Sequence, residues 1–445
     1  MTGWRSSSSS RPFHSATAAL VAACTAVGAS LVSGCGAVPG VAGGSREPVT
    51  VMTWAPEGTR STNMPGMPSM TEAYARWVNS HGGIDGHKLQ VLTCNEHNTA
   101  TGAAECARRA VKENAVAVIG SYSQYGRAFM APLEAAGIPY IGGYGVADEE
   151  FTSALSYPVN GGQATLLAGT GKQLAVWCER VSLVRPDTVS GDNLPVLLNS
   201  GLTAGHRKPT VDIRTTDDAG DYTPQAQAAL VGAGAGPDEP GRIGRKAAAD
   251  RARKGCVTAV LGDRTETFFD SFRRVESDGQ KVQIASVIGS VGQPLVNRTG
   301  GADGPFEGAY ITGWYPEATD PHWGPMREVI REQAFRDDTI DAADPGVQTT
   351  WIACTVLKKV VESLHQDKIA PHDLVRALNK GLTVDTGGLT PALRWKFDDM
   401  LAAPDFPRIV NRDVTFQVVK DGRLTSAKPG FTDVSSTMED ASALG

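Results

Sequence analysis

Residues 116–143 constrain the fold more than any other stretch of the chain. An apolar run ends at Gly120, a polar turn over 121–126 follows, and a helical pattern then leads through Gly137 to a second apolar run. This order reads as strand, loop, helix, strand, and two parallel strands require such a crossover. The polar turn lies where a strand ends and a helix begins, which is where open α/β sheets bind ligands. Ser and Tyr are also ordinary turn and cap residues, so the turn is equally open to a purely structural interpretation.

The same alternation extends over most of the chain. Four strand–helix units are predicted between 49 and 142, and a second series runs from 163 to 288. An extended segment at 310–315, three helices and a late strand at 415–419 follow. The pattern predicts an α/β protein with two doubly wound, Rossmann-like lobes. An Ala-, Gly- and Pro-rich stretch at 232–245 is expected to be a surface insertion of unassigned role.

The N-terminus has the pattern of a secretory signal. Arg5 and Arg11 precede an apolar run over 16–32, and no acidic residue occurs before Glu47. The run ends in Leu-Val-Ser-Gly-Cys at Cys35, which resembles a bacterial lipobox. We therefore expect a lipoprotein signal peptide at 1–35, lipidation of Cys35 and a flexible tether at 36–48. The alternative is an ordinary signal peptide with an incidental cysteine.

The remaining cysteines fit an oxidising compartment. Cys94 and Cys106 are close in sequence and are expected to pair, since extracellular thiols oxidise. Cys178 and Cys256 each precede an apolar strand and can be bridged if those strands are neighbours. Cys354 lies in an apolar helix and is expected to be a small buried side chain.

Composition and motifs argue against several classes of function. The net charge is −6, and no Lys/Arg cluster indicates nucleic-acid binding. The cysteine spacing supports no metal site, and no cofactor is expected. The sequence contains no Gly-x-Ser-x-Gly, His-Glu-x-x-His or P-loop motif, so an enzyme is not expected. A secreted hydrolase is a remote alternative, because no nucleophile and base are visibly paired.

A run of motifs resembles one family. Asn79 is followed by Gly82-Gly83-Ile84, then by Gly86 and Leu89. Further matches occur in the same order at 120–121, 136–139, 221–223 and 306–310. Together they resemble the type I periplasmic binding proteins, and in particular the branched-chain amino-acid (Leu/Ile/Val)-binding receptors of ABC transporters.

The resemblance implies two lobes joined by three hinge crossings. The crossings are expected near 156–161, 310–315 and 393–397. Lobe one would comprise 49–157 and 311–393, and lobe two 158–310 and 394–430. A polar tail would occupy 431–445.

The resemblance also implies a ligand site in the cleft between the lobes. Hydroxyls and backbone amides at helix N-termini hold a carboxylate well. The lobe-one candidates occupy two loops and the end of the first strand: Ser121, Tyr122, Ser123, Tyr125, Gly143, Tyr144, Gly145, Trp54 and Glu57. Glycine turns, rim tyrosines and simple packing of Trp54 are the structural alternatives.

Lobe two offers acids that could hold an ammonium group. These are Asp187, Asp192, Asp263 and Glu266, each of which could also be a solvated loop acid. The amino-acid-binding branch has a further acid after the strand at 283–288, where this chain has Gly289-Ser290-Val291-Gly292. The loop at 185–193 also lacks the tyrosine of that branch. Both departures argue against a free α-amino acid ligand.

These observations predict a monomeric, lipid-anchored solute-binding protein on the extracellular face of the cell membrane. It would capture a small amino-acid-like or other carboxylate-bearing solute and deliver it to a membrane ABC permease. A ligand-sensing receptor of the same fold, without transport, is the alternative.

Overall fold

The computed structural model describes residues 46–60, 62–188, 190–216, 219–235, 254–276 and 282–442. The predicted signal peptide, Cys35 and most of the tether lie outside these residues. So does most of the predicted insertion at 232–245. Among the described helices, none is long and apolar enough to cross a membrane.

The first sheet has five parallel strands in the order β2-β1-β3-β4-β5. They are β1 (Val49–Ala55), β2 (Leu89–Asn95), β3 (Ala117–Ile119), β4 (Tyr140–Ile141) and β5 (Ser156–Tyr157). Apart from the N-terminal strand pair, the order follows the chain, as in a doubly wound sheet. All five carboxyl ends therefore lie along one edge of the sheet.

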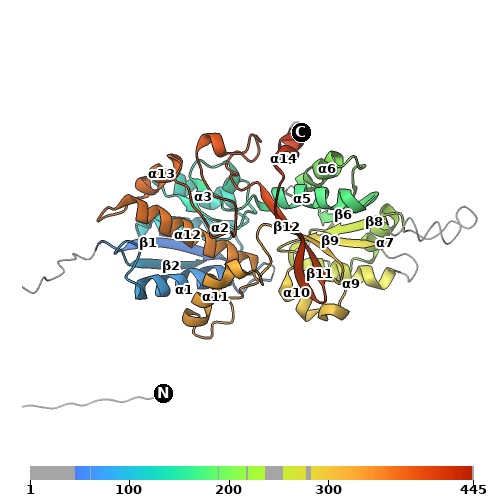
Figure 1. Ribbon diagram of the computed structural model, residues 1–445, viewed down its shortest axis with the longest axis horizontal. Helices are drawn as coiled ribbons and strands as arrows, with labels where there is room; N and C mark the ends of the chain where they lie inside the picture. The colour runs from blue at the N-terminus through green and yellow to red at the C-terminus, as the bar shows by residue number, and fades with distance from the viewer. Residues whose placement is uncertain are drawn as a thin grey trace, which may run out of the picture. The chain divides into compact units, whose positions relative to one another are not determined.

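Helices cover both faces of this sheet (Figure 1). On one face lie α1 (Gly66–Ser80) and α12 (Pro345–Leu364), and on the other α2 (Ala100–Lys112) and α3 (Gly126–Ala136). The strand β1 supplies both cores, because successive side chains of a strand point to opposite faces. Val49 and Val51 pack on one side, whereas Met52 and Trp54 pack on the other. Two-sided burial explains why this strand is apolar almost throughout.

The second sheet has seven strands in the order β12-β11-β10-β9-β8-β6-β7. They are β6 (Arg180–Pro186), β7 (Val211–Thr215), β8 (Gly255–Ala259), β9 (Gln283–Val287), β10 (Tyr310–Gly313), β11 (Asp413–Lys420) and β12 (Arg423–Asp433). The five strands β7-β6-β8-β9-β10 are parallel and repeat the order of the first sheet. The last two strands form an antiparallel hairpin on the β10 edge. The predicted pair of Rossmann-like lobes is confirmed.

Helices also cover both faces of the second sheet. The helices α5 (Gly162–Trp177), α6 (Leu194–Ala204) and α14 (Ser435–Ser442) lie on one face, and α7 (Thr223–Gly232) and α9 (Thr265–Val275) on the other. The remaining described helices are α4 (Glu149–Thr152), α10 (Gln293–Arg298), α11 (Gly324–Gln333), α13 (Pro371–Asn379) and five short 3₁₀ turns, η1 (Ser190–Asn193), η2 (Gly262–Arg264), η3 (Gly301–Asp303), η4 (Pro321–Trp323) and η5 (Phe397–Asp399).

The chain passes three times between the sheets: after β5, after β10 and before β11. Side chains tie the crossings to one another. The indole of Trp395 donates to Pro158 O at 3.1 Å, and Asn411 Nδ2 donates to Val159 O at 3.0 Å. The first and third crossings are therefore held together by hydrogen bonds.

The third crossing differs from the sequence-based boundary, which assigned 394–430 to lobe two. Phe406 packs edge-on against Phe151, and Arg408 Nε donates to Ser156 O at 2.9 Å. Phe406 and Arg408 therefore contact lobe one, although the predicted boundary placed them in lobe two. The chain reaches the second sheet at β11.

The C-terminal residues also differ from expectation. The sequence predicted a polar tail at 431–445, yet β12 continues to Asp433 and α14 follows. Val434 and Met438 are fully buried, and α14 packs against α5 and α6. Val434, immediately before the helix, and Met438 within it supply the apolar side chains that dock α14.

Both predicted disulfides are present. Cys94 joins Cys106, and Cys178 joins Cys256 with a Cα–Cα distance of 5.9 Å. The second pair forms because β6 and β8 are parallel neighbours, with Val181 opposite Cys256. Cys354 is a buried free cysteine, as expected.

Candidate functional site

The loop after β3 holds its first serine internally. Ser121 Oγ accepts from the backbone N–H of Trp54 at 3.2 Å and donates to Ile119 O at 3.2 Å. Trp54 itself is fully buried, with ring centroids 5.6 Å from Phe129 and 5.9 Å from Tyr140. The structure therefore places Trp54 in the core of lobe one, where it cannot close over a ligand, and corrects that expectation.

The second serine of this loop is also engaged. Ser123 Oγ donates to Glu96 Oε2 at 3.1 Å and accepts from the backbone N–H of Tyr125 at 3.1 Å. Glu96 is buried, which raises the pKa of its carboxyl group, and it also accepts from the Asn98 N–H. Tyr125 is half-buried at the start of α3. Both serine hydroxyls thus fix the loop to its own lobe.

The loop after β4 is organised around a buried carboxylate that the sequence analysis did not single out. Glu150 accepts hydrogen bonds from the N–H groups of Gly145 at 3.0 Å, Val146 at 3.0 Å and Ala147 at 3.1 Å. Burial outweighs these three donors and raises the pKa of Glu150 to about 7. A Cβ added at Gly143 would collide with the same carboxylate. The sequence predicts that the Gly145 N–H binds a ligand carboxylate. In the structure this N–H instead donates to the protein's own Glu150.

Aromatic rings connect the two lobe-one loops to the second crossing. The ring centroids of Tyr122 and Tyr144 are 5.2 Å apart, and those of Tyr144 and Trp314 are 5.3 Å apart, both edge to face. The Tyr144 hydroxyl lies against Gly289, which follows β9 in lobe two. Tyr144 thus spans the space between the lobes.

A buried polar network lies beside these rings. Asn160, in the first crossing, donates to the Tyr315 hydroxyl at 3.1 Å, and that hydroxyl lies 2.9 Å from Thr349 Oγ1 on α12. The Oδ1 atom of Asn160 accepts from Gly162 N–H at 2.9 Å. Burial raises the pKa of Tyr315 far above its usual range, so the phenol stays neutral. The network joins two crossings to lobe one.

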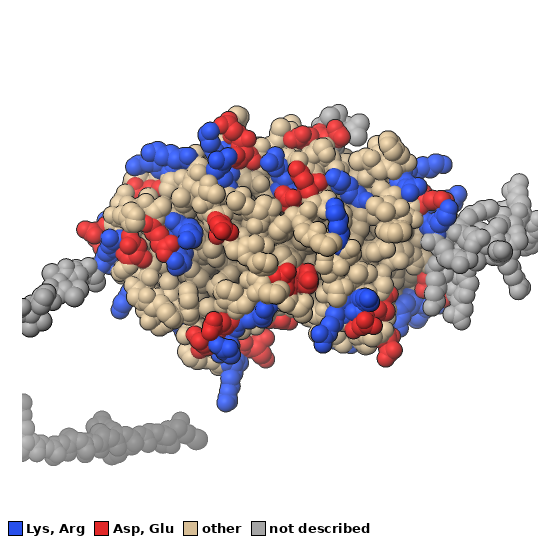
Figure 2. All heavy atoms as spheres, viewed as in Figure 1, with Lys and Arg blue, Asp and Glu red and all other residues tan. Residues whose placement is uncertain are grey.

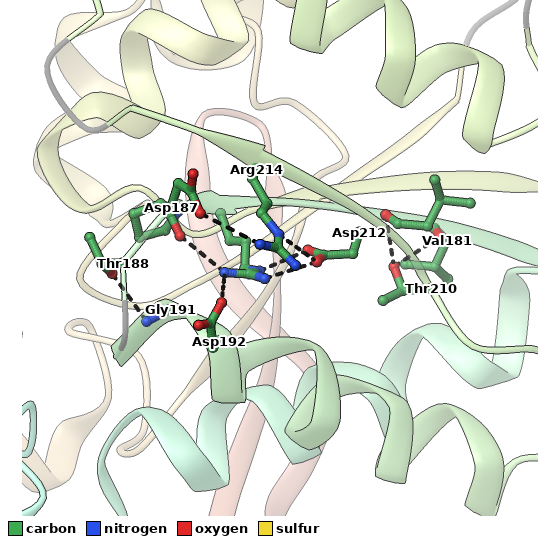
Figure 3. A network of polar contacts seen from close by, with 11 residues as sticks. Val181, Asp187, Thr188, Gly191, Asp192, Thr210, Asp212 and Arg214 are labelled. Carbon is green, nitrogen blue, oxygen red and sulfur yellow. Dashed lines mark hydrogen bonds and ion pairs between the residues drawn. The ribbon is translucent and has the colours of Figure 1, made fainter.

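One of the lobe-two acids is held by a buried arginine at the end of β6. The guanidinium of Arg185 is 2% exposed and donates to both carboxylate oxygens of Asp212, at 2.8 and 2.9 Å. It also donates to Asp192 Oδ1 at 2.9 Å. Figure 3 shows Asp192 and Asp212 converging on this network. Asp192 therefore already has a cationic partner.

The other lobe-two candidates have similar surroundings. Asp187 lies 3.8 Å from Arg214 (Figure 3), and Glu266 accepts from Arg298 at 2.8 Å. The side chain of Asp263 lies outside the described residues. In lobe one, Glu57 is exposed on the loop after β1. Every lobe-two candidate whose side chain is described therefore pairs with an arginine.

A cavity of about 470 Å³ lies at the carboxyl ends of β9 and β10. Its walls come from both lobes and from the second crossing, and include Ile288, Gln293, Trp314, Glu317, Gln348 and Gln417. Trp314 lines this cavity, and its ring also packs edge to face against Tyr144. Among the described residues lining this cavity, none is a residue that the sequence proposed for the site.

On the face shown in Figure 2, basic and acidic side chains are interspersed. Within the described residues, no group of three or more His, Cys, Asp or Glu side chains could hold a metal ion.

A family model named periplasmic binding protein matches residues 52–419. The chain belongs to the periplasmic binding protein family. A search of the curated proteins found no similar sequence. The match spans both lobes and all three crossings, so the predicted type I fold of this periplasmic binding protein is confirmed.

Solved structures share the fold of this periplasmic binding protein at low sequence identity. A leucine-binding protein from Thermotoga maritima is 14% identical with a TM-score of 0.64, covering 86% of this chain and 99% of its own. A solute-binding protein of an ABC transporter from R. palustris, in complex with 4-hydroxybenzoate, is 12% identical with a TM-score of 0.66, covering 87% and 98%. An ABC transporter substrate-binding protein from Aeropyrum pernix is 15% identical with a TM-score of 0.67, covering 89% and 98%.

Sequence reasoning missed the buried polar residues of this binding protein. Glu150 lies in a short acidic stretch that reads as solvent-exposed, and Asn160 lies in a predicted hinge. Gln348 and Gln417 fall in an apolar helix and an apolar strand. A polar residue at a position that periodicity assigns to the core is the one signal that could have found them.

Proposed function

We propose that this periplasmic binding protein captures a small polar solute between its lobes and delivers it to an ABC permease. The cavity at the ends of β9 and β10 carries the proposal. Its volume falls within the range of about 300–1,000 Å³ typical of small-molecule sites. Its position follows the rule that open α/β sheets bind ligands at the carboxyl ends of their strands.

Capture would work through closure of the two lobes. A solute that touches walls from both lobes binds the closed form more tightly than the open form. This difference in affinity shifts the population toward closure. Domain closure about crossing segments is a common response to such a ligand. The proposed role is capture without chemical conversion, and the closed form would be the one that docks on the permease.

The ligand class follows in part from the chain's relatives. Structures of the same fold hold 4-hydroxybenzoate and 3,4-dihydroxybenzoic acid, so a carboxylate-bearing solute is one class to test. The hydroxyls of Ser121 and Ser123 and the Gly145 amide already have internal partners, which disfavours a carboxylate at those groups. The arginine partners of Asp192 and Glu266 likewise disfavour an α-ammonium group there.

We also propose that the protein is secreted, attached to the outer face of the membrane through a lipid on Cys35, and monomeric. The support is the sequence pattern of Arg5, Arg11, the apolar run and the lipobox. Replacing Cys35 by Ser should release the protein from the membrane fraction into the medium. Continued membrane association of that variant would contradict the anchor but not solute binding.

A thermal-shift screen of purified protein tests the binding proposal. A solute that binds only the folded state raises the temperature midpoint of unfolding. At a solute concentration one hundred times Kd, the free energy of unfolding increases by about 2.7 kcal/mol. Amino acids, hydroxybenzoates, polyols and amines form the panel. A failure of every compound to shift the midpoint would contradict the proposal.

A further inference from the structure

Two buried glutamines, one from each lobe, give the cavity a defined chemistry. Gln348 lies on α12 of lobe one, and Gln417 lies on β11 of lobe two. Both line the cavity, and their exposed fractions are 5% and 3%. A ligand touching both side chains would connect the two lobes directly.

The backbone fixes the orientation of both amides. Gln348 Nε2 donates to Ala342 O at 3.0 Å. Gln417 Nε2 donates to Tyr315 O at 3.1 Å and to Thr415 Oγ1 at 3.1 Å. Rotating either amide by 180° would set an oxygen against a carbonyl oxygen, so the amide nitrogens stay where they are. Each Oε1 atom has no hydrogen-bond partner among the described residues and is available as an acceptor.

The chemistry of the wall selects the ligand. Unpaired amide oxygens favour O–H or N–H donors over a carboxylate. The two amides are neutral, so a bare ammonium ion would lose its hydration without gaining an opposite charge at this depth. Trp314 and Tyr315 add aromatic surface beside them. The charged residues of the lining, Glu317, Asp421 and Arg423, carry both signs and are more exposed.

We infer that the solute of this cavity is an uncharged, hydroxyl-rich molecule of the polyol or sugar class, bound by Gln348 and Gln417. The inference rests on the proposed function and specifies its ligand. The hydroxyl groups donate to the two Oε1 atoms, and the C–H surface of the solute packs against the aromatic wall. Donation to both glutamines links lobe one to lobe two and so favours closure.

Isothermal titration of the full chain with three sets of probes tests this inference. The first set is D-glucose, myo-inositol and glycerol, the second is L-leucine and 4-hydroxybenzoate, and the third is putrescine. At least one member of the first set should bind. Its Kd should rise at least tenfold in Gln348→Met and in Gln417→Met, because each removes one amide acceptor.

Two further variants separate site from stability. Gln173→Met is the matched control: Gln173 is an equally buried glutamine that donates to Gln417 O and accepts from Thr312, but it does not line the cavity. Its Kd should stay within twofold of the wild-type value. Ala318→Trp fills the cavity from its half-buried edge and should abolish binding.

The outcomes distinguish this inference from the function on which it rests. Binding of leucine, 4-hydroxybenzoate or putrescine without any polyol would overturn the ligand class and leave solute capture standing. If a polyol still bound to the Ala318→Trp variant, the proposed site would be wrong. The site would also be wrong if Gln173→Met raised the Kd as much as Gln348→Met does. Failure of all six probes would overturn both.

Discussion

The hydroxyl of Tyr144 in lobe one lies directly over Gly289 in lobe two, so that a Cβ built on Gly289 would come within 2.5 Å of it. Gly289 has a φ of +90°, a conformation that side chains rarely adopt. The turn after β9 is where the amino-acid-binding branch carries an acid. In this protein, the tyrosine of the facing lobe takes up that space.

Replacing Gly289 by Ala should destabilise the protein. The positive φ costs about 1 kcal/mol or more for a residue with a Cβ, and the collision with Tyr144 adds to it. We expect the free energy of unfolding to fall by about 2–3 kcal/mol in total. Urea unfolding followed by tryptophan fluorescence measures the change.

The same substitution in a Tyr144→Phe background separates the two contributions. Without the Tyr144 hydroxyl, only the cost of the backbone conformation remains. Gly289→Ala should therefore lower the free energy of unfolding of the Tyr144→Phe protein by only about 1 kcal/mol. Equal losses in both backgrounds would show that the Tyr144–Gly289 contact has no energetic weight.

Glu150 should make the stability depend on pH. Its pKa in the folded protein is about 7, against a usual value of 4.5. Between these values the folded state holds a proton that the unfolded state has released, so the free energy of unfolding decreases as pH rises through this window. The full effect is on the order of 3 kcal/mol. Denaturant unfolding at pH 4.5, 6 and 7.5 measures it.

Glu150→Gln is the control for this pH dependence. The amide does not titrate, so the variant should gain stability relative to wild type as pH rises, whatever its stability at pH 4.5. Parallel pH profiles for the two proteins would mean that Glu150 has an ordinary pKa.

The two disulfides should differ in their contribution to stability. Cys178 and Cys256 are separated by 78 residues, and Cys94 and Cys106 by 12. A longer closed loop restricts the unfolded chain more, by roughly 4.5 kcal/mol against roughly 3 kcal/mol in the chain-entropy model. Replacing each pair by alanines and measuring urea unfolding should give the larger loss for Cys178 and Cys256. The reverse order would mean that native packing, rather than chain entropy, decides.

Replacing the guanidinium of Arg185, or its main partner Asp212, should destabilise the folded protein. It is 2% exposed and binds both oxygens of Asp212, a geometry that lysine cannot reproduce. Asp212→Asn removes the negative charge that the buried Arg185 guanidinium contacts. We expect the free energy of unfolding to fall by about 3 kcal/mol or more. Arg185→Lys should also be destabilising. Chemical denaturation of both variants provides the measurement.

The exposed pair Lys254–Glu179 is the comparison for Arg185. Both side chains are more than half exposed, so solvent screens their interaction. Glu179→Gln should leave the unfolding midpoint unchanged. A loss as large as that of Asp212→Asn would indicate that burial does not control the strength of these ion pairs.

The fold could be predicted largely from local patterns. Apolar runs such as 116–119, each followed by a turn and a helix, predicted strands that the structure contains. The sequence left the pairing of Cys178 with Cys256 conditional on neighbouring strands, and β6 and β8 meet that condition. The docking of α14 was missed because only Val434 and Met438 mark its buried face, too few for a periodic signal.

The site was predicted less well, because local sequence does not reveal which groups are already paired. Ser121, Ser123 and Gly145 occur where expected, at the ends of β3 and β4. Glu96, the partner of Ser123, lies 27 residues away, whereas Glu150 lies only five residues after Gly145 and was read as a solvent-exposed acid. Whether a hydroxyl or an amide is free for a ligand depends on how such partners fold back onto it.

The second sheet is completed by the last strands of the chain. It begins with β6 at Arg180, yet β11 and β12 lie at 413–433 and α14 covers α5 and α6 only after that. A chain that emerges N-terminus first can therefore assemble the strands of its first sheet while the second still lacks an edge. The β11–β12 hairpin and α14 can join lobe two only after α12 and α13 have been made, so completion of lobe two follows completion of lobe one along the chain.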